Sequence, residues 1–344
     1  MKKKLIYSIL TALAILGIGA LMIYQQYIAG AVVPRDIKDP IVLIPTNSNF
    51  EEVVSILKKK GVVPNEKIFR FMAEKMNYIK NPMRSGRFEL KPGWSNVQMI
   101  RQLRNGKQAP VEVILTNERL VENVAAKVSR FIEPDSVDIL SLLQDENYLQ
   151  EIGYTPEILM SLFIPNTYEF YWNTSPREFV ERMIKEHDAF WAKDNRKAKA
   201  EALGLTPAEV YTLASIVEKE TQANAEKKRM AGVYYNRLKQ GIRLQADPTA
   251  VFARRDFNTT RVTHYHTKFD SPYNTYMYEG LPPGPISMAS IVTLDAVLNM
   301  EEHDYIFFCA RGDGSGLHNF AKTLAAHNQN ARIYKENLRK RGLR

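Results

Sequence analysis

Residues 206–221 (TPAEVYTLASIVEKET) combine a well-marked helix start with a continuous helical period. Thr206 can cap a helix, Pro207 suits the first turn, and Glu209 stands three residues after the cap, as a capping box requires. The pattern then places four apolar residues on one face at helical spacing: Val210, Leu213, Ala214 and Val217. We therefore expect a helix that buries this face in the core of a domain.

Two glutamates, Glu218 and Glu220, follow the apolar stripe. At about 100° per residue they lie on opposite borders of the buried face, so they are not expected to act as a catalytic pair. A half-buried carboxyl at the edge of a cleft has a raised pKa and can act as an acid. The alternative is that both are solvated residues near a helix end, and the helical pattern does not choose between them.

The composition limits the class of protein. A chain of 344 residues can form two domains, and 45% hydrophobic with 25% charged residues is ordinary for a globular protein. The net charge of +9 is compatible with nucleic acid, an anionic membrane surface or an acidic polymer as partner. No basic stripe is interleaved with aromatics, so nucleic acid is the least favoured. The single cysteine, Cys309, is expected in a core strand and excludes an internal disulfide.

The N-terminal segment predicts the compartment. Residues 5–24 contain no charge and follow three lysines. A bilayer span takes about 20 apolar residues, whereas a cleavable signal peptide has an apolar core of roughly 7–15. We therefore expect a transmembrane helix at 5–24 in a bacterial inner membrane, with residues 1–4 in the cytoplasm and the remainder in the periplasm or cell exterior. Cleavage near the small residues 29–31 is the alternative.

Residues 41–116 are expected to form a small α+β module after a linker at 25–40. The pattern predicts strands at 41–45 and 85–90 around two helices, then a helix capped by Ser95 and a strand at 111–115. The βααβ part resembles a LysM-like module, a type associated with binding glycan chains rich in N-acetylglucosamine. The alternative is an extracytoplasmic spacer.

Residues 117–344 are expected to form a larger, mainly helical catalytic domain with short strands. An aromatic segment at 163–171 is predicted to be a loop that lines a cleft, and 175–201 a single long helix. The stretch 241–285 has little periodicity and is rich in Tyr, Asn, Thr, Asp, Pro and Gly, which favours a sugar-binding surface over disorder. The predicted fold class is therefore α+β, with one transmembrane helix, the small module and the helical domain.

Several common catalytic motifs are absent. The segment GLPPGP (280–285) has too many prolines for a phosphate-binding nest, and its glycines more readily allow close backbone approach. His264 and His266 alternate without an HExxH motif, so we expect no metal and no cofactor. No GxSxG elbow is present. The carboxylates that remain, among polar and aromatic residues, point to work on glycosidic bonds.

The number of carboxyls that such a reaction needs depends on its course. A glycoside hydrolase normally needs two, one as acid and one as base or nucleophile. A lytic transglycosylase can use one, because the C6 hydroxyl of muramic acid closes on C1 in place of water. One carboxyl at a cleft edge would therefore be sufficient.

Five blocks of the sequence resemble the YceG-like family, the endolytic murein transglycosylases. In family order they are LASIVEKET (213–221), VYYNRL (233–238), LQADPT (244–249), SPYNTY (271–276) and GLPPGPI (280–286). The chain departs at 287–290, where the family often has an Asn-Pro-Gly turn. The resemblance implies an enzyme that cuts the MurNAc–GlcNAc β-1,4 bond within nascent peptidoglycan strands and leaves 1,6-anhydro-MurNAc ends.

The resemblance also implies the site residues. It assigns the role of general acid and then base to the first Glu of the EKE triplet, Glu218. The residues expected to line the cleft and bind substrate are Gln245, Asp247, Tyr273, Asn274, Thr275 and Tyr276. From the residue types alone, Glu220 favours a salt bridge at the helix border, Asp247 either orients its loop or contacts sugar, and the tyrosine cluster suits core packing as well as substrate contact.

Two other functions remain open at this point. One is a non-enzymatic envelope scaffold that binds peptidoglycan, and the other is a muramidase-type hydrolase. Peptidoglycan synthases and divisome proteins are candidate partners in either case.

Overall fold

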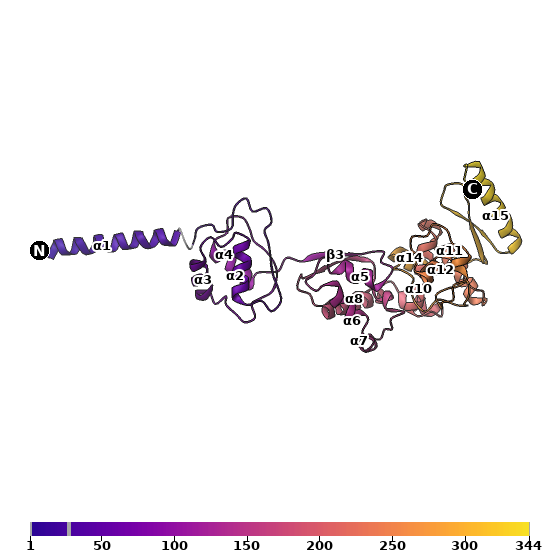
Figure 1. The fold of residues 1–344 in the computed structure, drawn as a ribbon, viewed down its shortest axis with the longest axis horizontal. Coiled ribbons are helices and arrows are strands. Elements are labelled where there is room, and N and C mark those ends of the chain that lie inside the picture. Colours follow the sequence, from indigo (N-terminus) through magenta and orange to yellow (C-terminus); the bar gives the residue numbers. More distant parts are fainter. Residues whose placement is uncertain (1, 26–28, 344) are drawn as a thin grey trace. The chain divides into compact units, whose positions relative to one another are not determined.

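The computed structural model describes residues 2–25 and 29–343, and it is an α+β structure of helices and short strands (Figure 1). Within those residues the strands form three two-stranded sheets, β1 with β2, β3 with β4 and β5 with β6. The chain divides into two compact units. Unit 1 comprises Met1–Glu112, Phe131–Glu133 and Glu169–Thr174, and unit 2 comprises Val113–Arg130, Pro134–Tyr168 and Ser175–Arg344.

The predicted transmembrane helix at residues 5–24 is wrong. In the part of the chain that the structure describes, no helix is both long and apolar enough to cross a membrane. Helix α1 (Lys2–Ile23) begins with lysines and contains hydroxyl-bearing side chains such as Tyr7 and Thr11, whereas a span needs about 20 predominantly apolar residues. Of the predicted tail and linker, residues 1 and 26–28 lie outside the described residues.

Unit 1 has the predicted order of strand, two helices and strand. Strands β1 (Ile41–Ile44) and β2 (Gly86–Glu89) pair antiparallel, with Ile41 opposite Glu89. Between and after them lie α2 (Phe50–Lys59), α3 (Glu66–Lys75) and α4 (Asn96–Asn105). Asn49, Asn65 and Ser95 cap these helices through their side chains, which satisfies backbone N–H groups that the first turn leaves free. The core of this unit includes Val53, Leu57, Phe69, Phe88, Met99 and Leu103.

Residues 163–201 differ from the prediction in two places. Asn166–Phe170 is strand β4, which pairs with β3 (Val111–Leu115), and not a cleft-lining loop. Tyr168 and Phe170 alternate inward along it and are buried, so the aromatic pattern reflects strand packing. The predicted long helix is two helices, α8 (Pro176–Ala192) and α9 (Arg196–Ala202), because the backbone turns left-handed at Asp194 and Asn195.

The remaining elements of unit 2 complete the helical domain. The early ones are short: α5 (Val121–Val128), α6 (Ser136–Leu143), α7 (Glu146–Glu151) and the 3₁₀ helix η2 (Leu159–Leu162). The later ones are α10 (Pro207–Glu220), α11 (Asn224–Lys239), α12 (Asp247–Arg254), α13 (His264–Thr267), α14 (Ile291–Leu298), β5 (Phe307–Ala310), β6 (His318–Ala321) and α15 (Leu324–Lys340). Cys309 lies in β5 as expected, but it is only half-buried.

Helix α10 lies at the centre of unit 2, packed against α9, α11, α12, α14 and η2. Thr206 and Glu209 form the predicted capping box. The buried face is wider than predicted, since every residue from 210 to 217 is buried. Polar side chains also fix the helix: the Tyr211 hydroxyl donates to the Phe163 carbonyl at 2.7 Å, and the Ser215 hydroxyl accepts from the Ile286 N–H at 3.0 Å.

Gly284 shows why the GLPPGP segment needs a glycine. A Cβ at this position would stand 1.9 Å from the Glu157 carbonyl oxygen, far inside van der Waals contact. The close backbone approach that the sequence predicted is therefore present at Gly284. It brings residues 280–286 against the segment before η2.

Candidate active site

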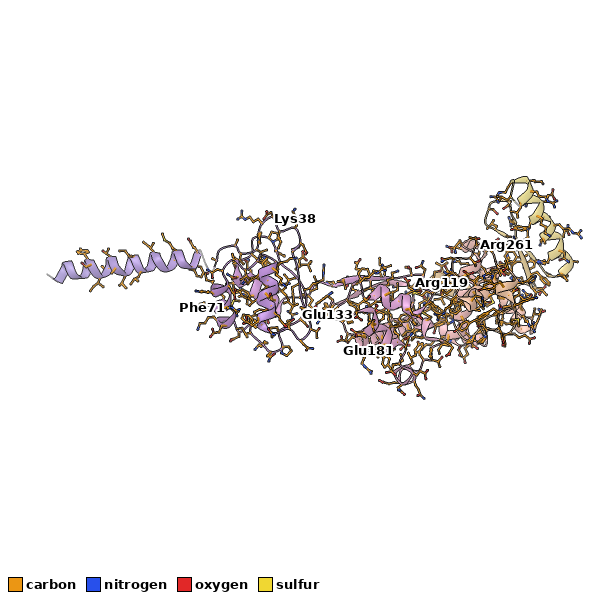
Figure 2. All side chains as sticks on the ribbon, viewed as in Figure 1. Lys38, Phe71, Arg119, Glu133, Glu181 and Arg261 are labelled. Carbon is orange, nitrogen blue, oxygen red and sulfur yellow. The ribbon has the colours of Figure 1, made fainter. Side chains whose placement is uncertain are left out.

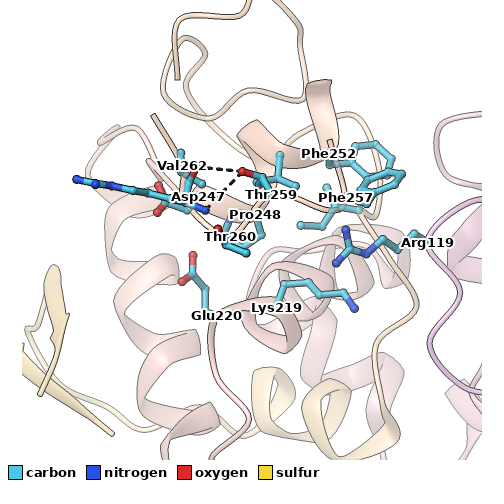
Figure 3. Close-up of a pocket in the computed structure, with 13 residues that line it drawn as sticks. Arg119, Lys219, Glu220, Asp247, Pro248, Phe252, Phe257, Thr259, Thr260 and Val262 are labelled. Carbon is cyan, nitrogen blue, oxygen red and sulfur yellow. Dashed lines mark hydrogen bonds between the residues drawn. The ribbon is translucent and has the colours of Figure 1, made fainter. Parts of the chain in front are cut away.

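Two adjoining cavities of unit 2 meet at the C-terminal end of α10. Cavity A has a volume of about 290 Å³ and is lined by residues that include Arg119, Lys219, Glu220, Asp247, Phe252 and Phe257 (Figure 3). Cavity B, of about 410 Å³, is lined by residues that include Glu220, Arg237, Gln245, Asp247, Tyr276 and His327. Glu220 and Asp247 line both cavities, so they form part of the wall that the two cavities share.

Glu220 is partly buried in the wall between these cavities. Its Oε1 accepts a hydrogen bond of 2.6 Å from the Tyr234 hydroxyl of α11. Burial raises the pKa of Glu220 to about 7; the Tyr234 hydrogen bond opposes this rise and the negative charge of Asp247 adds to it. A carboxyl in this state can both donate and accept a proton near neutral pH.

Glu218 lies in a different environment and does not itself line cavity A or cavity B. Its Oε2 accepts from the Ser290 hydroxyl at 2.7 Å, from the Lys227 ammonium at 3.2 Å and from the Thr293 hydroxyl. Burial raises its pKa, but the hydrogen bonds from Thr293 and Ser290 and the charge of Lys227 outweigh burial, so the pKa of Glu218 is lowered overall. Lys227 is only 3% exposed, so its ammonium needs a nearby negative charge. The Glu218 carboxylate supplies that charge.

Three of the six predicted cleft residues gather near Glu220. Gln245 and Tyr276 line cavity B, and Asp247 lines both cavities. The Tyr276 hydroxyl donates to Asp247 Oδ1 at 2.5 Å, and the Gln245 side-chain oxygen accepts from Arg237 at 3.0 Å. These bonds orient Asp247 and Gln245 at the cavity walls.

The other three predicted residues lie elsewhere. Tyr273 lines a separate cavity and packs against Phe252 with a ring separation of 4.9 Å. Asn274 is fully buried, and its amide donates to the carbonyls of His266, Thr267 and Phe269. Thr275 is also buried; its hydroxyl accepts from the Ala246 N–H at 3.0 Å. Asn274 and Thr275 thus hold the loop that carries Tyr276.

The sequence analysis did not single out the cations and aromatic rings of cavity A. Arg119 stacks over Phe257 at 4.7 Å, and the exposed Arg261 also lines this cavity. Both arginines are labelled in Figure 2. These residues are far from the EKE triplet in the chain, and no short motif links them to it. Only Lys219 had a local signal, its place between the two glutamates.

The two histidines that were considered as metal ligands do not form a cluster. His266 pairs with Asp256 at 3.0 Å between Nε2 and Oδ2, on the short helix α13. Among the described residues, no group of three or more His, Cys, Asp and Glu side chains is placed to hold a metal ion.

Comparisons with known proteins identify the relatives of this chain. The endolytic murein transglycosylase of Bacillus subtilis (strain 168) is 28% identical over 333 residues, which cover 91% of this chain and 89% of that protein. The endolytic murein transglycosylase of Streptococcus pneumoniae (strain D39) is 28% identical over 341 residues, covering 90% of this chain; this chain spans 61% of the pneumococcal protein's length.

A solved structure and a family model extend these comparisons. The crystal structure of a yceG-like protein from Listeria monocytogenes matches with a TM-score of 0.56 and 28% identity, over 84% of this chain and 97% of that one. The model of the YceG-like family matches residues 42–333, which is most of the sequence. The predicted resemblance is confirmed, and the chain belongs to the YceG-like family.

Proposed function

We propose that this chain is a peptidoglycan lytic transglycosylase that breaks the MurNAc–GlcNAc β-1,4 bond inside glycan strands. Relatives named endolytic murein transglycosylase support the reaction class. The observation that carries the proposal is the Glu220 carboxyl, which lines both cavities and has a pKa raised to about 7. Such a carboxyl can give a proton and later take one back at neutral pH.

In this mechanism one carboxyl serves twice. Protonated Glu220 donates its proton to the glycosidic oxygen as the bond from that oxygen to C1 of the muramic acid breaks. The resulting carboxylate takes the proton of the C6 hydroxyl, whose oxygen bonds to C1 and closes the 1,6-anhydro ring. The proton given is recovered and no water is consumed. Tyr234, which donates to Oε1 of Glu220, holds the carboxyl in place.

Glu218, which the family resemblance assigns to catalysis, stays a prediction. Its contacts favour a supporting role, because a carboxylate held by Lys227, Ser290 and Thr293 has a lowered pKa and is a poor proton donor near neutral pH. For this reason we propose Glu220 as the acid and base.

A muramidase-type hydrolase is a second candidate, and one observation favours it. Asp247 lines both cavities together with Glu220, so a second carboxyl faces the same space. In a hydrolase Asp247 would activate the water that attacks C1, while Glu220 protonates the leaving oxygen. The two reactions differ in their product.

These proposals are tested by mass spectrometry. The full chain is incubated with murein strands, and the released fragments are weighed. We expect 1,6-anhydro ends, lighter by one water than reducing ends, and no such fragments from Glu220→Gln. Reducing ends that disappear in Asp247→Asn would establish the hydrolase instead. Strands that bind the wild type but are not cut would favour the non-enzymatic scaffold.

We also propose that residues 41–116 are a LysM-like glycan-binding module and residues 117–344 the catalytic domain, acting outside the cytoplasm where murein lies. The antiparallel pairing of β1 and β2 around α2 and α3 supports the first assignment, and the main boundary between the compact units, after Glu112, supports the second. Unchanged retention on insoluble murein after deletion of residues 41–112 would contradict the glycan-binding role.

A further inference from the structure

Three cations line cavity A: Lys219, Arg119 and the exposed Arg261. Lys219 of α10 and Arg119, just before α5, line one side of the cavity, across from Glu220 and Asp247 (Figure 3). Among the described residues, neither forms an ion pair, and the Arg119 guanidinium instead stacks on Phe257. Burial and the charge of Arg119 lower the pKa of the Lys219 ammonium, and the negative charge of Glu218 opposes this lowering without cancelling it. Two neighbouring positive charges in a partly buried wall repel each other. An anion bound between them would offset this repulsion.

Arg119 also stands at the entrance to a third space. Cavity C, of about 510 Å³, is lined by residues that include Arg119, Leu143, Leu159, Met160, Phe252 and Tyr273. Cavities A and C share Arg119 and Phe252, whereas A and B share Glu220 and Asp247. Cavity A therefore borders cavity B at Glu220 and Asp247 and borders cavity C at Arg119 and Phe252.

A linear glycan needs one path past the carboxyl, but a branched one needs a second path for its branch. Murein is branched, because its muramic acid residues carry short peptide stems with free carboxylates. We propose that Lys219 and Arg119 bind a carboxylate of the peptide stem, with the stem continuing into cavity C, so that the enzyme selects strands that still carry their peptides. This inference rests on the proposed function, since it takes murein as the substrate.

The lining of cavity C suits a peptide. The half-buried apolar side chains of Leu120, Val121 and Phe252 line this cavity and fit small aliphatic side chains. The acidic residues of this cavity are already engaged: Glu122 pairs with Arg255 at 3.7 Å, and Glu157 accepts from the Thr155 hydroxyl at 2.7 Å. They leave Arg119 available to an incoming carboxylate.

Steady-state cleavage of two substrates tests the inference: murein strands with intact stems, and the same strands after an amidase has removed the stems. Wild type should show a kcat/KM about tenfold higher on stem-bearing strands, as expected for a charged hydrogen bond at a site of this kind. Lys219→Gln and Arg119→Gln should lower kcat/KM for stem-bearing strands about tenfold more than for stem-free strands. Lys219→Arg, which keeps the charge, should retain the preference.

Lys268→Gln is the matched control, because Lys268 is exposed, carries the same charge and lies outside the three cavities. This variant should leave kcat/KM unchanged on both kinds of strand. Equal losses on both substrates in Lys219→Gln would show a general structural role and overturn the inference, and so would a wild type that does not distinguish the two kinds of strand.

Binding separates this inference from the proposed function. If wild type cuts neither substrate, the proposed function fails, and calorimetric titration with a synthetic stem tetrapeptide still decides the inference. The inference is supported if the full chain binds the tetrapeptide, if Lys219→Gln weakens this binding about tenfold, and if Lys268→Gln leaves it unchanged. Equal affinity of all three proteins, or no binding to any, would overturn it.

Discussion

Glu218 and Glu220 stand two residues apart on α10, and the fold gives them opposite surroundings. Glu218 turns toward α11 and α14, where Lys227, Ser290 and Thr293 stabilise its charged form. Glu220 turns toward the cavities, where burial and Asp247 oppose its charge. The difference shows that the acidity of a carboxyl follows from its neighbours in space, so adjacent positions on one helix can serve structure and chemistry separately.

The largest expected effect concerns activity. Glu220→Gln should lower kcat on murein strands by about 10²- to 10⁴-fold, the usual contribution of a general acid and base. Glu218→Gln, measured in the same assay at a temperature where both variants are folded, should retain much more activity. If Glu218→Gln loses more activity than Glu220→Gln, Glu218 is the catalytic residue and the comparison between the two carboxyls is reversed.

A smaller effect concerns stability at pH 6. Glu218→Gln leaves the Lys227 ammonium buried without its counter-charge and should lower the free energy of unfolding by about 2 kcal/mol. Urea denaturation measures this loss. The double variant Glu218→Gln/Lys227→Met should recover part of it, whereas Glu220→Gln should stay within about 1 kcal/mol of wild type. Full additivity in the double variant would mean that the ion pair does not stabilise the fold.

The two carboxyls should also respond oppositely to pH. The folded-state pKa of Glu220 is raised from 4.5 to about 7, so its stabilising contribution is complete below about pH 4.5 and is lost as the pH rises to 7. For Glu218 the folded-state pKa is lowered, so its contribution is present above its ordinary pKa of 4.5 and is lost as the pH falls below that value.

Unfolding free energies at pH 5 and pH 8 measure this contrast. Glu220→Gln should match wild type at pH 5 and exceed it by about 1–2 kcal/mol at pH 8, because the variant no longer carries a charge in the cavity wall. An identical pH dependence of the two proteins would show that Glu220 titrates normally.

The smallest expected effect is on the pH profile of catalysis. Wild-type kcat/KM should fall as the pH rises above about 7, when Glu220 loses the proton it must donate. The Tyr234 hydrogen bond lowers the pKa of Glu220, so Tyr234→Phe should move this decline to higher pH. Tyr235→Phe is the control, since its hydroxyl bonds the Leu203 carbonyl away from the site. If Tyr234→Phe and Tyr235→Phe have the same pH profile of kcat/KM, Tyr234 does not set the pKa of the group that titrates.

Features that depend on short-range interactions were predictable from the sequence, whereas features that depend on distant partners were harder to predict. Local capping was predictable, because Asn49, Ser95 and Thr206 bond to backbone only a few residues away, and all three cap the expected helices. Patterns that depend on distant partners were harder. The aromatic segment around Tyr168 was predicted to be a cleft loop, but it pairs with β3 and is buried. Hydrophobicity alone also led to the transmembrane prediction for residues 5–24, which the structure contradicts.

From the sequence alone we could predict helix α10, its cap at Thr206, and the ordered blocks that place the chain in its family. The helical pattern did not decide between Glu218 and Glu220, because both follow the same apolar stripe, and the choice of Glu218 came from the family resemblance and stays a prediction. The tertiary structure set them apart through residues that lie from 9 to 75 positions away from Glu218 and through Tyr234 and Asp247 near Glu220. The free energy of a charged carboxyl depends on burial and on charges and donors within a few ångströms, and only the folded chain brings those together.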